Sequence, residues 1–76
     1  MNKIPTNKIN PRKLLGSKWT AVEPANKEKH FIVTEMEFDD EGVVTSCVIE
    51  AVMSKRTFPI QWPDLKSQDQ WIQGWK

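Results

Sequence analysis

The chain has 76 residues, including four Trp, three Phe and one Cys, and its formal net charge is +1. This length supports one small domain, since a chain of this size buries only about 60% of the surface that it exposes when unfolded. The single Cys47 excludes an intrachain disulfide and fits a reducing compartment. The sequence has neither an apolar run of about 18 residues nor a secretory signal, so we expect a cytoplasmic protein with no membrane partner.

Charged residues are distributed unevenly along the chain. Residues 1–18 carry five Lys or Arg and no acid, residues 19–53 carry two Lys and eight acids, and residues 54–76 carry four Lys or Arg and two acids. A basic segment beside an acidic body either binds a polyanion or lies against its own body. We regard the second outcome as the commoner one.

The first part of the chain predicts a lead-in followed by one strand. Residues 1–12 contain two Pro and are expected to form a flexible basic lead-in, with a single β domain over residues 13–76. The β-branched and aromatic content of residues 18–22 predicts the first strand, which Pro24 ends. Residues 23–29 then form a polar connection to the next strand.

The middle of the chain predicts a β-hairpin. Residues 30–38 alternate in polarity, residues 39–42 form a tight polar turn ending in Gly, and residues 43–52 form the next strand. The second of these strands is apolar on both faces, which indicates either a central strand or one that bends around a small barrel and has a bulge. The alternation of the first strand predicts four core-facing residues, which are Ile32, Thr34, Met36 and Phe38. The second strand is expected to place five residues on one face, which are Val43, Cys47, Ile49, Ala51 and Met53.

A fourth strand and a helical turn follow the hairpin. Residues 57–62 predict a strand in which Phe58, Ile60 and Trp62 alternate toward the core. Because Pro59 cannot donate a ladder hydrogen bond, this strand either lies at an edge of the sheet or turns that backbone position toward water. Residues 64–67 predict a single helical turn, with Leu65 pointing toward the core.

The last residues fit two structures. Trp71 and Trp75 have the spacing of one helical turn, but residues 70–75 also alternate as a strand, and we favour a fifth strand that closes the sheet because Gly74 lies inside the pattern. These elements together predict a mainly β fold. It is a small antiparallel meander of four to five strands, shaped as an SH3-like or partly open barrel, with a short helical turn near the C-terminus.

The sequence also resembles a known family through many short matches between Asn10 and Lys76. The matching segments are Asn10-Pro11, Lys13-Leu14-Leu15, Ser17-Lys18-Trp19-Thr20-Ala21-Val22, Lys27-Glu28-Lys29-His30-Phe31, Gly42-Val43-Val44, Cys47-Val48, Glu50-Ala51-Val52, Ser54-Lys55-Arg56, Trp62, Leu65-Lys66, Trp71 and Gly74-Trp75-Lys76. On these residues the chain is similar to the small bacterial tryptophan-rich protein family. That family has no assigned activity, so the resemblance implies no catalytic role.

Few residues in the chain have chemistry suited to catalysis. His30 and Cys47 are the only residues of their types, and a thiol in the middle of an apolar strand has a raised pKa and little reactivity. One His and one Cys do not make a zinc site, and the acidic turn at residues 39–41 lacks the spacing of a calcium loop. We therefore predict a protein that is not an enzyme, with no catalytic residues, no cofactor and no metal.

Binding is the remaining class of function. Cations and indoles are adjacent at three separated points of the sequence, and together they give a candidate binding surface of six residues: Lys18, Trp19, Lys55, Arg56, Trp71 and Trp75. The alternative is that the indoles fill the core while the Lys and Arg stems lie over them. The exposure of the Trp side chains separates these two interpretations.

Two partners fit such a surface. Single-stranded nucleic acid would stack its bases on the indoles while the cations hold its backbone, and this is the partner that we favour from sequence. A protein partner would instead dock on exposed aromatic side chains at a sheet edge, as in an SH3-like or Tudor-like adaptor.

Overall fold

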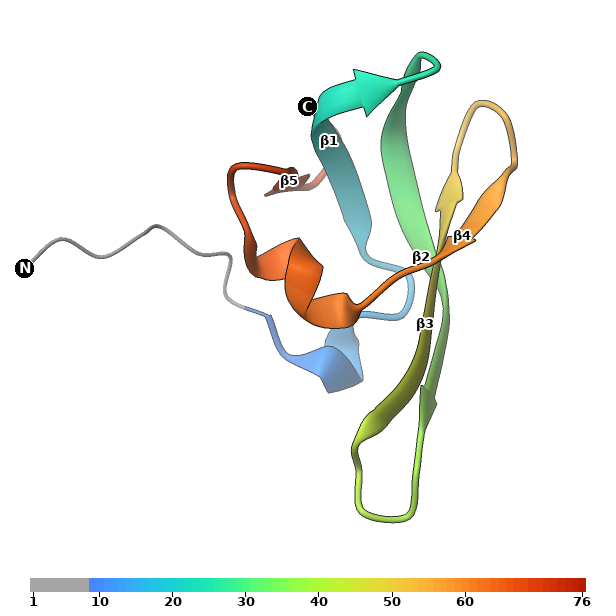
Figure 1. Ribbon diagram of the computed structural model, residues 1–76, viewed down its shortest axis with the longest axis vertical. Helices are drawn as coiled ribbons and strands as arrows, with labels where there is room; N and C mark the ends of the chain where they lie inside the picture. Colours follow the sequence, from blue (N-terminus) through green and yellow to red (C-terminus); the bar gives the residue numbers. More distant parts are fainter. Residues whose placement is uncertain (1–8) are drawn as a thin grey trace, which may run out of the picture.

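The computed structural model describes residues 9–76, which form one antiparallel sheet with two short 3-10 helices (Figure 1). The strands and helices are β1 (Lys18–Ala25), β2 (Glu28–Phe38), β3 (Val44–Ala51), β4 (Thr57–Pro59), β5 (Trp71–Gln73), η1 (Pro11–Lys13) and η2 (Trp62–Lys66). The order of the strands in the sheet is β4-β3-β2-β1-β5. The mainly β meander, its interior third strand, its edge strand at Pro59 and its fifth strand are thus confirmed.

The predicted barrel is wrong, because β4 and β5 form the two edges of the sheet and do not pair with each other. The fourth strand ends at Pro59 and not at residue 62. Residues 60 and 61 instead lead into η2, which connects one edge of the sheet to the other (Figure 1). A three-residue strand ending in Pro offers too few ladder groups to close a barrel.

The predicted start of the fold differs from the structure in two respects. β1 continues through Pro24 to Ala25, and the predicted polar connection is a two-residue turn at Asn26 and Lys27, whose φ angles are 54° and 62°. Two consecutive positive φ angles are characteristic of the tight turns that join antiparallel strands. Pro24 is accommodated because the β1–β2 ladder is irregular between Thr20 and Ala25. Residues 1–8 of the predicted lead-in lie outside the described residues, and Asn10 caps η1 by accepting the Arg12 N–H at 3.0 Å.

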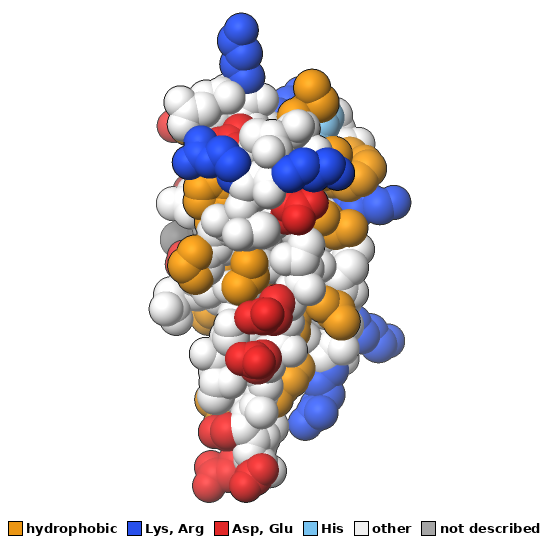
Figure 2. Space-filling view, turned by 90° about the vertical axis from the view of Figure 1, so that its right-hand side faces the viewer, with side chains coloured by type: hydrophobic (Ala, Val, Ile, Leu, Met, Phe, Trp, Pro, Cys, Tyr) orange, Lys and Arg blue, Asp and Glu red, His pale blue; other side chains and the backbone are white. Residues whose placement is uncertain are grey.

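The hairpin of β2 and β3 is confirmed. Gly42 has a φ of 83° in its turn, and the Asp39 carboxylate accepts the N–H groups of Glu41 and Val43 at 2.9 Å each. Acidic side chains gather over this end of the molecule, whereas most Lys and Arg side chains lie above it (Figure 2). The acidic turn is therefore separated from most of the basic residues.

One face of the sheet, here called the inner face, carries the core. The predicted inward set on β2 is wrong in its first half: Phe31 and Val33 are buried, while Ile32 is half-buried and Thr34 is exposed. A bulge between Val33 and Glu35 shifts the alternation, so that Met36 packs against the core again. The buried apolar residues are Leu14, Trp19, Phe31, Val33, Cys47, Ile49, Ala51 and Leu65. The predicted face of the third strand is therefore right in its middle and wrong at its ends, because Val43 and Met53 lie outside β3 and are exposed.

The C-terminal residues lie on the opposite, outer face. After β5, Gly74 has a φ of 84°, which turns the chain back toward β1. The hydroxyl of Thr20 donates to the Gly74 carbonyl at 2.6 Å and accepts the Lys76 N–H at 2.9 Å. These bonds bury Thr20 and fix the chain end against the sheet. None of the helices in residues 9–76 has the length and apolar content needed to cross a membrane.

Candidate functional site

The six residues of the predicted binding surface do not form one surface. Trp19 is only 1% exposed, and its indole N–H donates to the Ser17 hydroxyl at 2.8 Å, so it is a core residue that offers no face to a ligand. Lys18 and Trp75 meet on the outer face. Arg56 and Trp71 line a recess on the inner face, and Lys55, with a φ of 64°, is exposed in the loop between β3 and β4.

The recess on the inner face is the main candidate site, and we call it the aromatic hollow. It has a volume of about 340 Å³. Its apolar lining comes from all five strands or their immediate continuations, and consists of Ala21, Ala25, Phe31, Ile49, Phe58, Ile60 and Trp71. Register explains why these residues meet, since Trp71 pairs with Ala21, and Phe58 pairs with Ile49. Residues directly opposite on neighbouring strands share a face.

Three aromatic rings in the hollow hold one another in place. Phe31 meets Trp71 edge-on, with ring centroids 5.3 Å apart and an interplanar angle of 84°. Phe31 also meets Phe58 at 6.3 Å and 63°. Edge-to-face pairs of this kind are favoured by the ring quadrupoles. Phe31 is buried, whereas Phe58 and Trp71 are half-buried, so the hollow presents aromatic surface that is positioned before any partner arrives.

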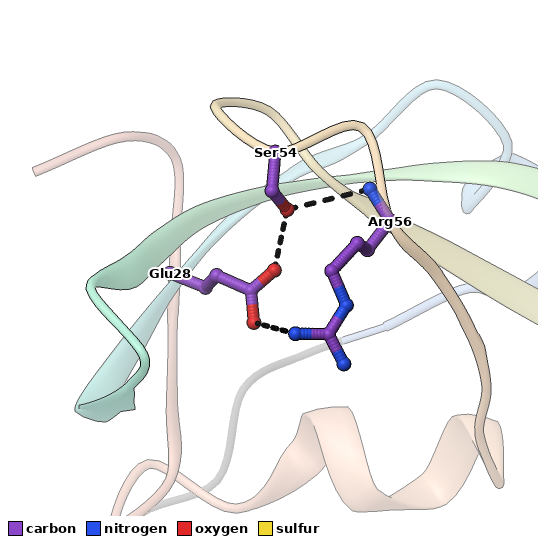
Figure 3. Close-up of polar contacts among 3 residues, drawn as sticks. All are labelled: Glu28, Ser54 and Arg56. Carbon is purple, nitrogen blue, oxygen red and sulfur yellow. Dashed lines mark hydrogen bonds and ion pairs between the residues drawn. The ribbon is translucent and has the colours of Figure 1, made fainter.

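A carboxylate and a guanidinium lie at the rim of the hollow (Figure 3). Glu28 begins β2, and its carboxylate accepts the Ser54 hydroxyl and lies 3.4 Å from the Arg56 guanidinium. The Arg56 N–H in turn donates to the Ser54 hydroxyl at 3.3 Å. The Glu28 side chain is 8% exposed and the Arg56 side chain 55% exposed, so the acid is held within the protein while its cation reaches solvent.

Acids outnumber cations around the hollow. Glu23 and Glu28 line it together with a single Arg56. An adjoining recess of about 300 Å³ shares Trp71, Ala21 and Glu23 with the hollow, and adds Asp69. The three acids and one cation that line the two recesses give a net formal charge of −2, which favours a cationic ligand over an anionic one.

The outer face carries a second aromatic feature around Trp75. The indole is 44% exposed and its N–H donates to the Phe31 carbonyl at 3.0 Å. The Lys18 ammonium lies 4.9 Å from the ring centroid, and the His30 ring lies 6.1 Å away. Lys18 also lines a recess of about 320 Å³ beside η1, together with Lys13. A cation, Lys18, therefore lies against the Trp75 ring, whereas Glu23 and Asp69 lie near Trp71.

The only His and the only Cys of the chain lie on different faces of the sheet. Cys47 is buried in the core, and burial raises the pKa of its thiol. His30 is on the outer face, where its Nε2 lies 3.0 Å from the Lys76 carbonyl oxygen. A Cys–His pair thus gains no support from the geometry. Within residues 9–76, no group of three or more His, Cys, Asp or Glu side chains is placed to hold a metal ion.

A family model described as tryptophan-rich protein (DUF2389) matches residues 17–76, which include all five strands and both recesses around Trp71. The chain belongs to this family. The resemblance drawn from the sequence is thereby confirmed, and the family has no known function. No curated protein and no solved structure matches the chain significantly.

Sequence reasoning missed two residues of the hollow in this tryptophan-rich protein, which are Phe31 and Glu28. Phe31 was assigned to the wrong face of β2 because the bulge after Val33 does not show in the alternation of residue types. Glu28 was assigned to a polar connection, although it begins a strand and is buried. Phe58 was expected to point inward, but its place beside Arg56 depends on the pairing of β4 with β3.

Proposed function

We propose that the tryptophan-rich protein is a non-catalytic binding module of the cytoplasm that holds a segment of a partner protein in the aromatic hollow. The observation that supports this function is the hollow itself, where Phe31, Phe58 and Trp71 line an open recess of about 340 Å³. Partly exposed aromatic side chains in a fixed arrangement are typical anchors of protein interfaces. A single free Cys fits the reducing compartment.

Charge favours a protein segment over nucleic acid at this site. A phosphate backbone near Trp71 would meet the carboxylates of Glu23 and Asp69, with only Arg56 to offset them. A peptide with apolar and cationic side chains would gain from both the aromatic lining and the acids. The preferred partner at the hollow is therefore the second of the two that the sequence suggested.

Selection from a phage-displayed library of short random peptides tests this function. We expect peptides that shift the Trp71 indole N–H signal in nuclear magnetic resonance spectra and bind Phe58→Ala about tenfold more weakly than the wild type. Trp75→Phe is the matched control, since it alters an indole on the other face and should bind normally. Peptides whose affinity is the same for Phe58→Ala and the wild type would contradict the proposal.

The outer face favours a second candidate, which is single-stranded nucleic acid. Trp75 is exposed, the Lys18 ammonium lies 4.9 Å from its ring centroid, and Lys76 is its neighbour in the chain. A base stacked on this indole would have cations close to its phosphates. Oligothymidine should then quench the fluorescence of the wild type but not of Trp75→Phe, and its affinity should fall steeply between about 50 and about 200 mM salt. Equal quenching in both proteins would exclude this surface.

A further inference from the structure

We infer that the aromatic hollow recognises a diffuse organic cation, a guanidinium or a methylated ammonium carried by the partner, and that Arg56 occupies this cation site in the free protein. This inference rests on the proposed function and specifies the anchor that the partner supplies. It follows from how Arg56 is held, from what surrounds it and from the burial of Glu28.

Arg56 shows that the hollow accepts a cation. The centre of its guanidinium lies 5.0 Å from the centroid of the Phe58 ring, and one of its nitrogens lies 3.4 Å from the Glu28 carboxylate. An aromatic face and a carboxylate are the two groups that stabilise an organic cation in proteins. The chain's own side chain thus makes the contacts that a ligand cation would make.

The contact between Arg56 and Glu28 is loose. Charge-assisted N–H···O bonds are usually about 2.7–2.9 Å long, and Arg commonly binds a carboxylate through two of them. Here the distance is 3.4 Å and one guanidinium nitrogen takes part. More than half of the Arg56 side chain is exposed to solvent, so solvent screens its contact with Glu28, and a second cation that takes its place beside the carboxylate can displace it at little cost.

Glu28, in contrast, is held firmly. It is buried, its second carboxylate oxygen accepts the Ser54 hydroxyl, and it lies at the start of β2, where the chain is fixed by the turn with Ala25 (Figure 3). A buried carboxylate needs a cation beside it. If Arg56 swings into solvent, a cation from the partner replaces it beside the same carboxylate and the same Phe58 ring.

The rest of the hollow would complete the site for that cation. Trp71 and Phe31 add two further rings, and Glu23 adds a second carboxylate at the rim. Aromatic side chains beside an acid favour a large, weakly hydrated cation over a compact one, because desolvation of a compact ammonium is costly. Guanidinium and methylated ammonium groups have this property.

Titration with small probes separates charge from shape. We would add tetramethylammonium, N-acetyl-arginine amide and the neutral analogue neopentyl alcohol, each at matched ionic strength, and follow the Trp71 indole N–H signal. The two cations should shift the signal at lower concentration than the neutral analogue. A response to only one of them identifies which cation the partner carries. Equal responses to the cations and to neopentyl alcohol would overturn the inference.

Variants at the rim test the role of each charge. Arg56→Gln should bind the cations several-fold more tightly than the wild type, since the competing guanidinium is gone. Glu28→Gln should bind them about tenfold more weakly. If Glu28→Gln proves unfolded, Glu28→Asp is measured in its place; this variant keeps the charge and should retain the preference for the cations over neopentyl alcohol. Lys55→Gln is the matched control, because it removes a neighbouring exposed cation outside the hollow. Weaker cation binding by Arg56→Gln would contradict the displacement.

The two proposals can fail separately. Selected peptides that need Phe58 but show no preference for a cationic residue would refute the cation site and leave the peptide-binding function intact. If neither peptides nor cations disturb Trp71, the function of the hollow falls together with the inference.

Discussion

Two parts of the inner face are built by the same strands but differ in how their apolar side chains are covered. Around Trp19 and Val33, two leucines complete the core. Leu14 follows η1, Leu65 lies within η2, and both are buried. Around Phe58 and Trp71 the apolar side chains remain half-buried at an open recess. We call the first part the sealed core, in contrast to the aromatic hollow.

The difference has a local cause in the chain. The segment after η1 is tied to β2, since the Gly16 N–H donates to the Val33 carbonyl at 2.8 Å and the Ser17 carbonyl accepts the Val33 N–H at 3.0 Å. At the hollow, the corresponding cover is the charged pair of Glu28 and Arg56 at the rim. The buried side chains of Leu14 and Leu65 stay in place in the folded protein, whereas the exposed side chain of Arg56 can move away from the hollow. The sheet therefore provides stability at one part of its inner face and a binding surface at another.

Large-to-small substitutions provide the strongest test of this difference. Leu65→Ala should lower the free energy of unfolding by about 3 kcal/mol, because it opens a cavity beneath a fully buried side chain. Phe58→Ala removes a larger side chain but should cost only about 1–2 kcal/mol, since the ring is half exposed already. Urea unfolding followed by circular dichroism measures both. Equal losses would show that the hollow is part of the core.

Thiol labelling should distinguish the two regions by accessibility. Cys47 lies in the sealed core and has a raised pKa because it is buried, so it should react with a soluble disulfide reagent at least about a hundredfold more slowly than an open thiol. The protein for comparison is the double variant Cys47→Ala/Ile60→Cys, in which the only thiol lies at the hollow and should react faster than Cys47 in the wild type. Similar rates for the two proteins would contradict an open hollow.

The sequence indicates the sealed core better than the hollow. Leu65 in a helical turn, Cys47 and Ala51 on one face of β3, and the hairpin at Gly42 were all predicted from local patterns, because each depends on residues within a few positions of one another. The hollow depends on pairings between distant strands and on a bulge after Val33, neither of which local alternation reveals.

The Trp residues show the same limit. Composition indicates that four indoles must contribute to so small a core, but it does not say which. Trp19 is buried whereas Trp75 is on the outer face, and the distinction follows from their register with β2 and from the turn at Gly74. The predicted surface therefore combined residues from two faces and from the core.

A double-mutant cycle at the rim tests how loosely Arg56 is held. We expect Arg56→Gln and Glu28→Gln to show a coupling free energy of less than about 1 kcal/mol, because the guanidinium is largely exposed and the contact is long. Thermal and urea unfolding of the wild type, both single variants and the double variant give this value. A coupling energy of several kcal/mol would mean that Arg56 closes the hollow as firmly as Leu65 closes the core.

The smallest expected effect is a pH dependence that belongs to the sealed core. Because burial raises the pKa of the Cys47 thiol, the folded protein keeps the thiol proton at a pH where the unfolded chain has lost it. This stabilisation is complete below the unfolded value of about 8.5 and decreases as the pH rises through the folded value. In Cys47→Ala no thiol titrates, so the difference in unfolding free energy between the wild type and this variant should decrease by a few tenths of a kcal/mol or more above about pH 8.5. If the unfolding free energies of the two proteins change in parallel up to the pH at which lysine titrates, water reaches Cys47. The core would then be open to solvent like the hollow, and the two regions would not differ in the way proposed.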